Sequence, residues 1–188
     1  MRDQKTWEAR ELPRLLANAL TLTPRLRRDT VSIAAGEWPD PKIQNTYLWG
    51  KVGTGKTIDA AFLWIEAKRQ AFINSTGGGI MFTTTPALIA EIQNTFDSKD
   101  KSTGDVVLKY QAADVLVLDD LGSEKMSAWV YSQLYLIINY RYEYLLPTII
   151  TSNYDLDELA DRLEDERIPR RIEDEYVIKH KTGKTWKK

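Results

Sequence analysis

The chain has 188 residues, of which 43% are hydrophobic and 28% are charged, and its formal net charge is −1 at pH 7. This length suffices for one α/β core, and a net charge so close to zero excludes a strongly basic protein, so any nucleic-acid surface must be local. The absence of cysteine excludes disulfides and thiolate metal sites and fits a reducing compartment. No apolar run approaches the length of a membrane span, so we expect a cytoplasmic protein with no membrane partner.

The first 45 residues predict a short helical extension, because they are too few for a separate domain of ordinary size. Trp7, Leu12 and Leu15 give residues 1–20 a rough apolar face, and Pro13 predicts a break or a helix start. We expect this extension to act as a lid beside a ligand or as a docking segment.

From residue 46 onward, predicted strands and helices alternate, which favours a mainly parallel sheet with helices on both faces. The predicted strands are 46–49, 79–84, 114–118 and 147–152, and the predicted crossover helices are about 56–73, 86–96 and 127–143. We expect this core to span 46–178 and a basic tail, which contains the single histidine His180, to span 179–188.

The segment Gly50-Lys51-Val52-Gly53-Thr54-Gly55-Lys56-Thr57 satisfies the G-x-x-x-x-G-K-[ST] pattern of a P-loop. It lies between a predicted strand and a predicted helix, where backbone N–H groups and the helix dipole hold phosphates. A chance match in a glycine-containing loop is the alternative, which these flanking elements disfavour. We expect a bound nucleotide, with Lys56 on its β- and γ-phosphates and Thr57 on Mg²⁺; the other predicted contacts are Gly50, Gly53, Thr54 and Gly55.

Two adjacent acids, Asp119 and Asp120, follow the apolar run Val115–Leu118. The carboxyl ends of buried parallel strands face the ligand crevice, so we assign Asp119 to the metal and Asp120 to the attacking water. On their own, two acids after a strand are more often a helix cap or a turn. Their place after a P-loop favours the metal site.

Asn153 ends a further apolar strand, at the same edge of the predicted sheet. There its amide can hydrogen-bond the γ-phosphate or the attacking water, although a turn-forming asparagine is the alternative. Arg167 and Arg171 lie in a charged run farther along the chain. They can stabilise charge on a neighbouring subunit's γ-phosphate, as an arginine finger does, or pair with the acids around them.

Together these motifs resemble the DnaC-like and IstB-like branch of the AAA+ ATPases, which includes bacterial and phage helicase loaders. The resemblance covers roughly residues 45–175 and is carried by Gly50–Thr57, by Val115–Lys125 and by the block from Leu136 to Asn153, which ends Pro-Thr-Ile-Ile-Thr-Ser-Asn. It implies ATP and Mg²⁺ as cofactors. It also implies that Asp119 and Asp120 are the Walker B pair, that Asn153 is sensor 1, and that Arg171 is the trans-acting arginine with Arg167 beside it.

The resemblance further implies a P-loop NTPase of AAA+ type, with a five-stranded, mainly parallel sheet flanked by helices. We expect no C-terminal lid domain, because the chain stops soon after the arginine motif. The family's loaders usually carry a separate N-terminal domain that grips the helicase, whereas only about 45 residues precede the core here.

A DNA contact is predicted between the second crossover helix and the Walker B strand, where relatives carry an insertion that binds single-stranded DNA. Lys99, Lys101 and Lys109 can contact phosphates there, with an affinity that falls as salt rises. The acidic residues among them make a plain flexible loop an equal alternative.

We therefore expect a slow, assembly- or DNA-stimulated ATPase that forms a ring or helical oligomer and helps load a replicative helicase onto single-stranded DNA. An IstB-like transposition helper is the first alternative. The second is a non-hydrolysing adaptor, because Asp120 replaces the glutamate common in AAA+ proteins and must reach the water with a shorter side chain. We find no acceptor-binding signature that would indicate a metabolic kinase.

Overall fold

The computed structural model describes residues 3–18, 42–76, 79–96 and 100–182. Its centre is a five-stranded sheet in the order β2-β3-β4-β1-β5, in which all neighbouring pairs are parallel. The strands are β1 Thr46–Trp49, β2 Ile80–Thr84, β3 Val115–Leu121, β4 Thr148–Ser152 and β5 Val177–His180. The predicted α/β class and parallel sheet are confirmed.

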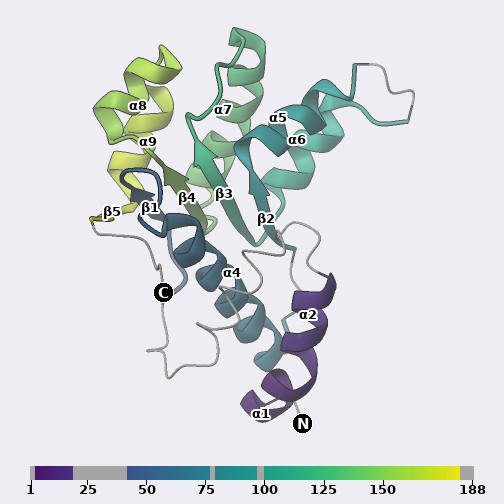
Figure 1. Cartoon of the computed structure of the whole chain (residues 1–188). Coiled ribbons are helices and arrows are strands. Elements are labelled where there is room, and N and C mark those ends of the chain that lie inside the picture. Colours follow the sequence, from purple (N-terminus) through teal and green to yellow (C-terminus); the bar gives the residue numbers. More distant parts are fainter. Residues whose placement is uncertain (1–2, 19–41, 77–78, 97–99, 183–188) are drawn as a thin grey trace.

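Helices connect the strands and cover both faces of the sheet (Figure 1). They are α4 Lys56–Ile73, α5 Thr85–Gln93, α6 Thr103–Gln111, α7 Ala128–Glu143, α8 Leu156–Leu163 and α9 Arg167–Glu175. The predicted helix at 56–73 is confirmed, and the one at 127–143 begins one residue later than predicted. The helix predicted at 86–96 ends at Gln93, and α6, α8 and α9 were not predicted as helices.

Alternation along the strands divides the core between the two faces. On β3, Leu116 and Leu118 pack into a cluster with α5 to α9, whereas Val115 and Val117 pack toward α4. Because both faces are buried, β3 is apolar at every position until Asp119, as expected for a central parallel strand.

The N-terminal helices pack at the far end of α4 from the P-loop. They comprise α1 Gln4–Thr6, the π-helical turn η1 Trp7–Glu11 and α2 Leu12–Asn18. Trp7 is buried, and its ring centroid lies 5.6 Å from that of Phe72, near the C-terminus of α4. The expected lid role is therefore wrong for residues 3–18, and residues 19–41 lie outside the described part of the chain.

The fifth strand, β5, lies across the boundary that we expected between the core and the tail, because it begins at Val177 and ends at His180. β5 pairs with β1 from Val177↔Thr46 to His180↔Trp49, and the ring of the exposed His180 stacks on Trp49 with centroids 3.8 Å apart. After α9, the described residues form this strand and no helical lid, and residues 183–188 lie outside them. Among the described helices, none combines the length and apolar character needed to cross a bilayer.

Candidate nucleotide-binding site

The predicted motif residues meet at one edge of the sheet. β1, β3 and β4 are neighbours and parallel, so their carboxyl ends bring the P-loop, Asp119, Asp120 and Asn153 together. α4 starts at Lys56, so the last two residues of the P-loop motif form the first turn of this helix. A strand-to-helix turn beside two further strand ends is the arrangement that holds a nucleotide in open parallel sheets.

The backbone of the P-loop requires glycine at two positions in particular. Gly55 is the N-cap of α4 in the left-handed region, with φ 90°. Gly50 has φ 145°, and a Cβ there would lie 2.4 Å from the carbonyl oxygen of Lys181, just after β5. The loop is thereby held between α4 and the chain that leaves β5.

Lys56 is buried and surrounded by oxygens. Its Nζ donates to Gly50 O at 2.7 Å, to Lys51 O at 3.0 Å and to Asn153 Oδ1 at 3.0 Å. Burial lowers the pKa of Lys56, and the nearby carboxylates of Asp120 and Asp119 oppose that shift. An ammonium group held among oxygens at the start of a helix suits the phosphates of a nucleotide.

Asp119 and Thr57 form a set of oxygen donors. Thr57 Oγ1 donates to Asp119 Oδ1 at 2.9 Å, and Thr151 Oγ1 donates to the same oxygen at 2.6 Å. Burial raises the pKa of Asp119, and the two threonine hydrogen bonds oppose this. Mg²⁺ prefers hydroxyl and carboxylate oxygens, so Thr57 and Asp119 fit the predicted metal ion.

Asp120 is turned toward Asn153 by a break in the sheet. The register of β3 against β4 shifts between Leu118 and Leu121, and Asp120 has φ 64°, which is unusual for a residue with a side chain. Thr151 Oγ1 accepts the N–H of Asp120 at 2.9 Å, and Asn153 Nδ2 donates to Asp120 Oδ1 at 3.2 Å. The Asn153 amide therefore links Lys56 to Asp120.

Thr151 is a site residue that the sequence interpretation missed. Its hydroxyl contacts both the Asp119 carboxylate and the Asp120 backbone, and the residue is 1% exposed. The available signal was a polar residue inside an apolar strand, two positions before Asn153. Thr151 therefore links β4 to Asp119 and Asp120.

The candidate finger residues lie on α9, where they contact α7. Arg171 donates to Asn139 and Tyr135 of α7, and Arg167 forms an ion pair with Asp165 at 2.8 Å. Within the described chain, the contacts of Arg171 connect it to α7 and α9 and not to the P-loop. This placement suits residues that would act on a neighbouring subunit.

The predicted DNA-contact lysines differ in their surroundings. Lys109 lies on α6 and forms an ion pair with Glu91 at 2.7 Å, so its charge is partly neutralised. Lys101 is exposed just before α6, and Lys99 lies outside the described residues. Thr103 and Gly104, expected in a loop, form the first turn of α6, which a Ser102–Asp105 capping box begins.

An exposed aromatic pair lies close to this region. Phe96 follows α5 and Trp129 belongs to the first turn of α7; they are 62% and 39% exposed, with ring centroids 4.8 Å apart. Large aromatic side chains in water form stacking surfaces for unpaired bases.

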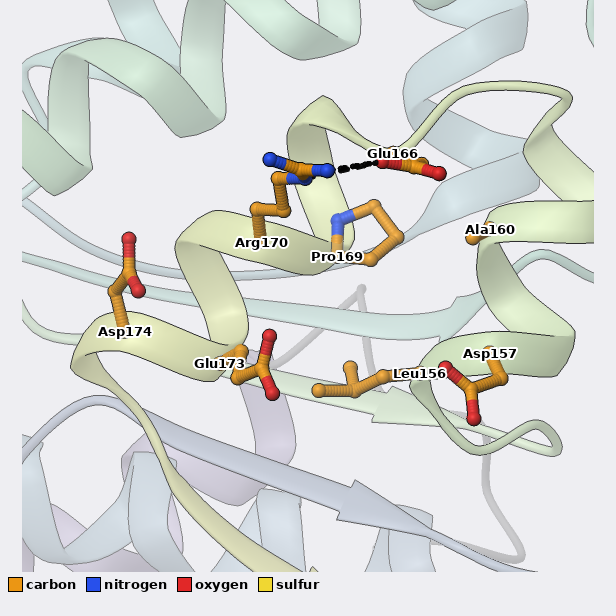
Figure 2. Close-up of a pocket in the computed structure, with 8 residues that line it drawn as sticks. All are labelled: Leu156, Asp157, Ala160, Glu166, Pro169, Arg170, Glu173 and Asp174. Carbon is orange, nitrogen blue, oxygen red and sulfur yellow. Dashed lines mark hydrogen bonds and ion pairs between the residues drawn. The ribbon is translucent and has the colours of Figure 1, made fainter.

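A separate cavity of about 460 Å³ lies between α8 and α9, away from the motif residues (Figure 2). Its lining includes the acidic residues Asp157, Glu173 and Asp174 and the ion-paired Arg170 and Glu166. None of the P-loop residues, Asp119, Asp120 or Asn153 lines it, so it is not the nucleotide site.

Known proteins are similar to this chain in sequence. The replicative helicase loader DnaI of Bacillus subtilis is 29% identical over 119 residues, which are 63% of this chain and 36% of that protein. A putative ATP-binding protein in an insertion sequence of Mycobacterium tuberculosis is 31% identical over 121 residues, which are 64% of this chain and 45% of that protein. The chain thus spans less than half the length of these curated relatives.

Solved structures share the fold. A crystal structure of DnaI is 27% identical in sequence and matches with a TM-score of 0.60. The alignment covers 92% of this chain and 94% of the DnaI chain. A crystal structure of the DnaC helicase loader is also 27% identical and matches with a TM-score of 0.59, over 93% of this chain and 100% of the DnaC chain. AMPPCP-bound DnaA from Aquifex aeolicus has a TM-score of 0.62 over 96% of this chain and 47% of that one, and at 18% identity it shows the fold alone.

These comparisons confirm the P-loop AAA+ fold and the relation to helicase loaders and IstB-like ATPases. The family model described as IstB-like ATP binding protein matches residues 22–184, which is most of the chain. The chain therefore belongs to the IstB-like ATP-binding protein family.

Proposed function

We propose that this chain binds and hydrolyses ATP as a helicase-loader-type ATPase in the cytoplasm, and helps deliver a replicative helicase to single-stranded DNA. The observation that carries the proposal is the contact chain from Lys56 through Asn153 to Asp120, beside Thr57 and Asp119. It places a phosphate cation, a polar amide and a carboxylate within one hydrogen-bonded set. The similarity to DnaI and DnaC supports the loader role.

In this proposal each side chain of the site has one role in phosphoryl transfer. Thr57 and Asp119 hold Mg²⁺, which when bound neutralises charge on the phosphates. Lys56 binds the β- and γ-phosphates. Asp120 orients the attacking water and accepts its proton, and Asn153 keeps the Asp120 carboxylate and the Lys56 ammonium group aligned.

Self-assembly completes the site in the same proposal. Arg171, with Arg167 beside it, stabilises the γ-phosphate of a neighbouring subunit, so hydrolysis depends on a ring or helical oligomer. The location of both arginines on α9, in contact with α7, supports a role in trans.

We place the single-stranded DNA contact beside Phe96 and Trp129, with Lys101 and Lys99 supplying phosphate contacts. The exposed aromatic pair supports stacking of bases, and the ion pair with Glu91 partly neutralises the charge of Lys109, the third predicted lysine. Weak sites aligned in an oligomer would bind one strand with an avidity that a single subunit lacks.

A transposition helper is the second candidate function. The match to the IstB-like family and the similarity to an insertion-sequence protein favour it. Co-purification of the chain with a candidate replicative helicase and with a candidate transposase separates the two functions. Capture of the helicase alone is the expected result, and capture of the transposase alone contradicts the loader proposal.

Hydrolysis is tested with purified protein, ATP, Mg²⁺ and single-stranded DNA. We expect DNA-stimulated release of phosphate, and loss of ATP binding in Lys56→Ala, because that variant lacks the buried ammonium group proposed to bind the β- and γ-phosphates. Tight ATP binding by Lys56→Ala would contradict the P-loop assignment. ATP binding without any turnover would favour the nucleotide-switched adaptor.

A further inference from the structure

Arg171 is held in place by two side chains of α7. Its Nε donates to Asn139 Oδ1 at 2.6 Å, and one terminal nitrogen donates to the Tyr135 hydroxyl at 2.7 Å. The other terminal nitrogen donates to Arg167 O at 2.9 Å. A guanidinium group has five N–H donors, of which the described residues of the same subunit accept from three, so two of them are left to meet an anion as far as the described chain shows.

Tyr135 also contacts both candidate arginines through its ring. The ring centroid lies 4.5 Å from Arg167 Cζ and 4.8 Å from Arg171 Cζ. Arg167 is held from another direction by Asp165, and its hydrogen bonds lower the pKa of that carboxyl to about 2. One aromatic side chain thus fixes the spacing of two cations on α9.

The neighbouring arginine provides a contrast on the same helix. The side chain of Arg170 is 72% exposed, and its ion-pair partner Glu166 is 67% exposed. An ion pair so exposed is screened and holds a side chain only weakly. Unlike Arg170, Arg171 is therefore an ordered cation on this helix, and α7 is the element that orders it.

We propose that Tyr135 and Asn139 are positioning residues for trans hydrolysis, which hold Arg171 in the orientation that a neighbouring subunit's γ-phosphate requires. This inference rests on the proposed trans-acting role of Arg171. A long side chain that is already oriented loses less freedom when the oligomer forms, and a small misplacement of a catalytic cation costs much of its effect. The Asn139 amide is itself held by Glu143, to whose Oε1 it donates at 2.8 Å.

The test uses Tyr135→Phe in the full chain, because phenylalanine keeps the ring contacts and removes the hydroxyl that accepts from Arg171. We expect kcat for DNA-stimulated ATP hydrolysis to fall about 10- to 100-fold, with KM for ATP and the thermal midpoint unchanged. Tyr140→Phe is the matched control, since Tyr140 lies on the same helix and stacks on Tyr144. Its rate should equal that of the unmodified chain.

A mixing experiment separates positioning in trans from a structural role. Asp120→Asn subunits carry an intact Arg171 and, in the proposed mechanism, cannot hydrolyse ATP themselves. Added in excess, they should restore the rate per Tyr135→Phe subunit, because they supply a well-positioned arginine to its site. A rate in Tyr135→Phe within about twofold of normal would overturn the inference, as would a loss that these subunits do not restore.

Asn139→Ala gives a second test, because it keeps the Tyr135 side chain and removes the oxygen that accepts from both Arg171 Nε and the Tyr135 hydroxyl. We expect the same fall in kcat and the same recovery with Asp120→Asn subunits. These two results test the inference even if Tyr135→Phe does not fold. Full activity in Arg171→Ala would contradict the proposed trans-acting arginine itself. An inactive Arg171→Ala beside a fully active Tyr135→Phe and Asn139→Ala would contradict only the positioning role.

Discussion

Asn153 is the residue at which the two halves of the candidate site meet. It accepts a hydrogen bond from Lys56 and donates one to Asp120, and of the side chains that could stand there an amide does both without a charge. The left-handed backbone of Asp120 is part of the same arrangement, because strained conformations persist where surrounding contacts enforce them. Asn153, the proposed sensor residue, is therefore also a structural link between Lys56 and Asp120.

The buried, charged carboxylate of Asp119 lowers the free energy of unfolding at neutral pH. Burial raises its pKa, so the folded state binds a proton more readily than the unfolded state does. As pH falls through that raised pKa, protonation of Asp119 removes the loss of unfolding free energy that its buried charge causes. The loss is fully removed below the pKa of an aspartate in the unfolded chain, which is about 3.9. At neutral pH the charged carboxylate is held at the expense of stability.

We accordingly expect the free energy of unfolding of Asp119→Asn to be about 1 kcal/mol higher than that of the unmodified chain at pH 7. The variant should also lose Mg²⁺-dependent ATP hydrolysis. This advantage should shrink on acidification and vanish near pH 4. Urea unfolding at pH 7, 5 and 4 measures it. An advantage that stays constant with pH would show that the carboxylate charge is not the cause.

Gly50 is required by the chain that leaves β5. With φ 145° and a Cβ that would lie 2.4 Å from Lys181 O, Gly50→Ala should cost about 1–3 kcal/mol and weaken ATP binding. Gly104→Ala is the control, because that glycine lies in α6 with its nearest atom at 3.5 Å, and a gain of about 0.5–1 kcal/mol is expected. Equal unfolding free energies for the two variants would contradict the close approach.

At the scale of elements, Arg141 connects α7 and α6 with the start of β4. It is fully buried on α7 and donates to the carbonyls of Tyr110, Gln111 and Ala113, at and just beyond the end of α6, and to Pro147 and Thr148 at the start of β4. The carbonyl end of a helix is partially negative, which suits a cation. Burial lowers the pKa of Arg141 to about 10, so the group stays charged at neutral pH.

We expect Arg141→Ala to lower the free energy of unfolding by about 3–5 kcal/mol, because several buried carbonyls lose their donor at once. Arg141→Lys should recover only part of this, since an ammonium group cannot reproduce the planar set of donors. Urea denaturation of both variants gives the comparison. A full recovery by lysine would mean that charge alone, and not geometry, holds these elements together.

The elements that the sequence interpretation missed are the short ones on the edges. α6 and α8 each begin with a capping box, Ser102–Asp105 and Asp155–Glu158, which is visible in the sequence as a polar residue followed three positions later by an acid. β5 has no such signal. Its four residues are all exposed, so no alternation of burial marks them, and only pairing with β1 makes them a strand.

At the scale of the whole molecule, the proposed arginine of one subunit completes the site of another. The hydrolysis rate per subunit should therefore rise with protein concentration until assembly is complete. In Arg171→Ala we expect the maximal rate to fall about a thousandfold and the concentration dependence to disappear. Steady-state rates over a dilution series, with light scattering on the same samples, measure both. A rate per subunit that is constant on dilution to monomers would contradict hydrolysis in trans.

The sequence by itself determined the fold class and the core of the candidate site. The P-loop pattern, the apolar strand ending in Asp119 and Asp120, and the strand ending in Asn153 are local signals, and parallel strands necessarily bring their carboxyl ends to one edge. Tertiary structure alone decided the contacts of Thr151, the pairing of Lys109 with Glu91 and the hold of α7 on Arg171. These contacts join residues 18 to 36 positions apart on different elements, where periodicity and spacing carry no information and packing decides which side chains meet.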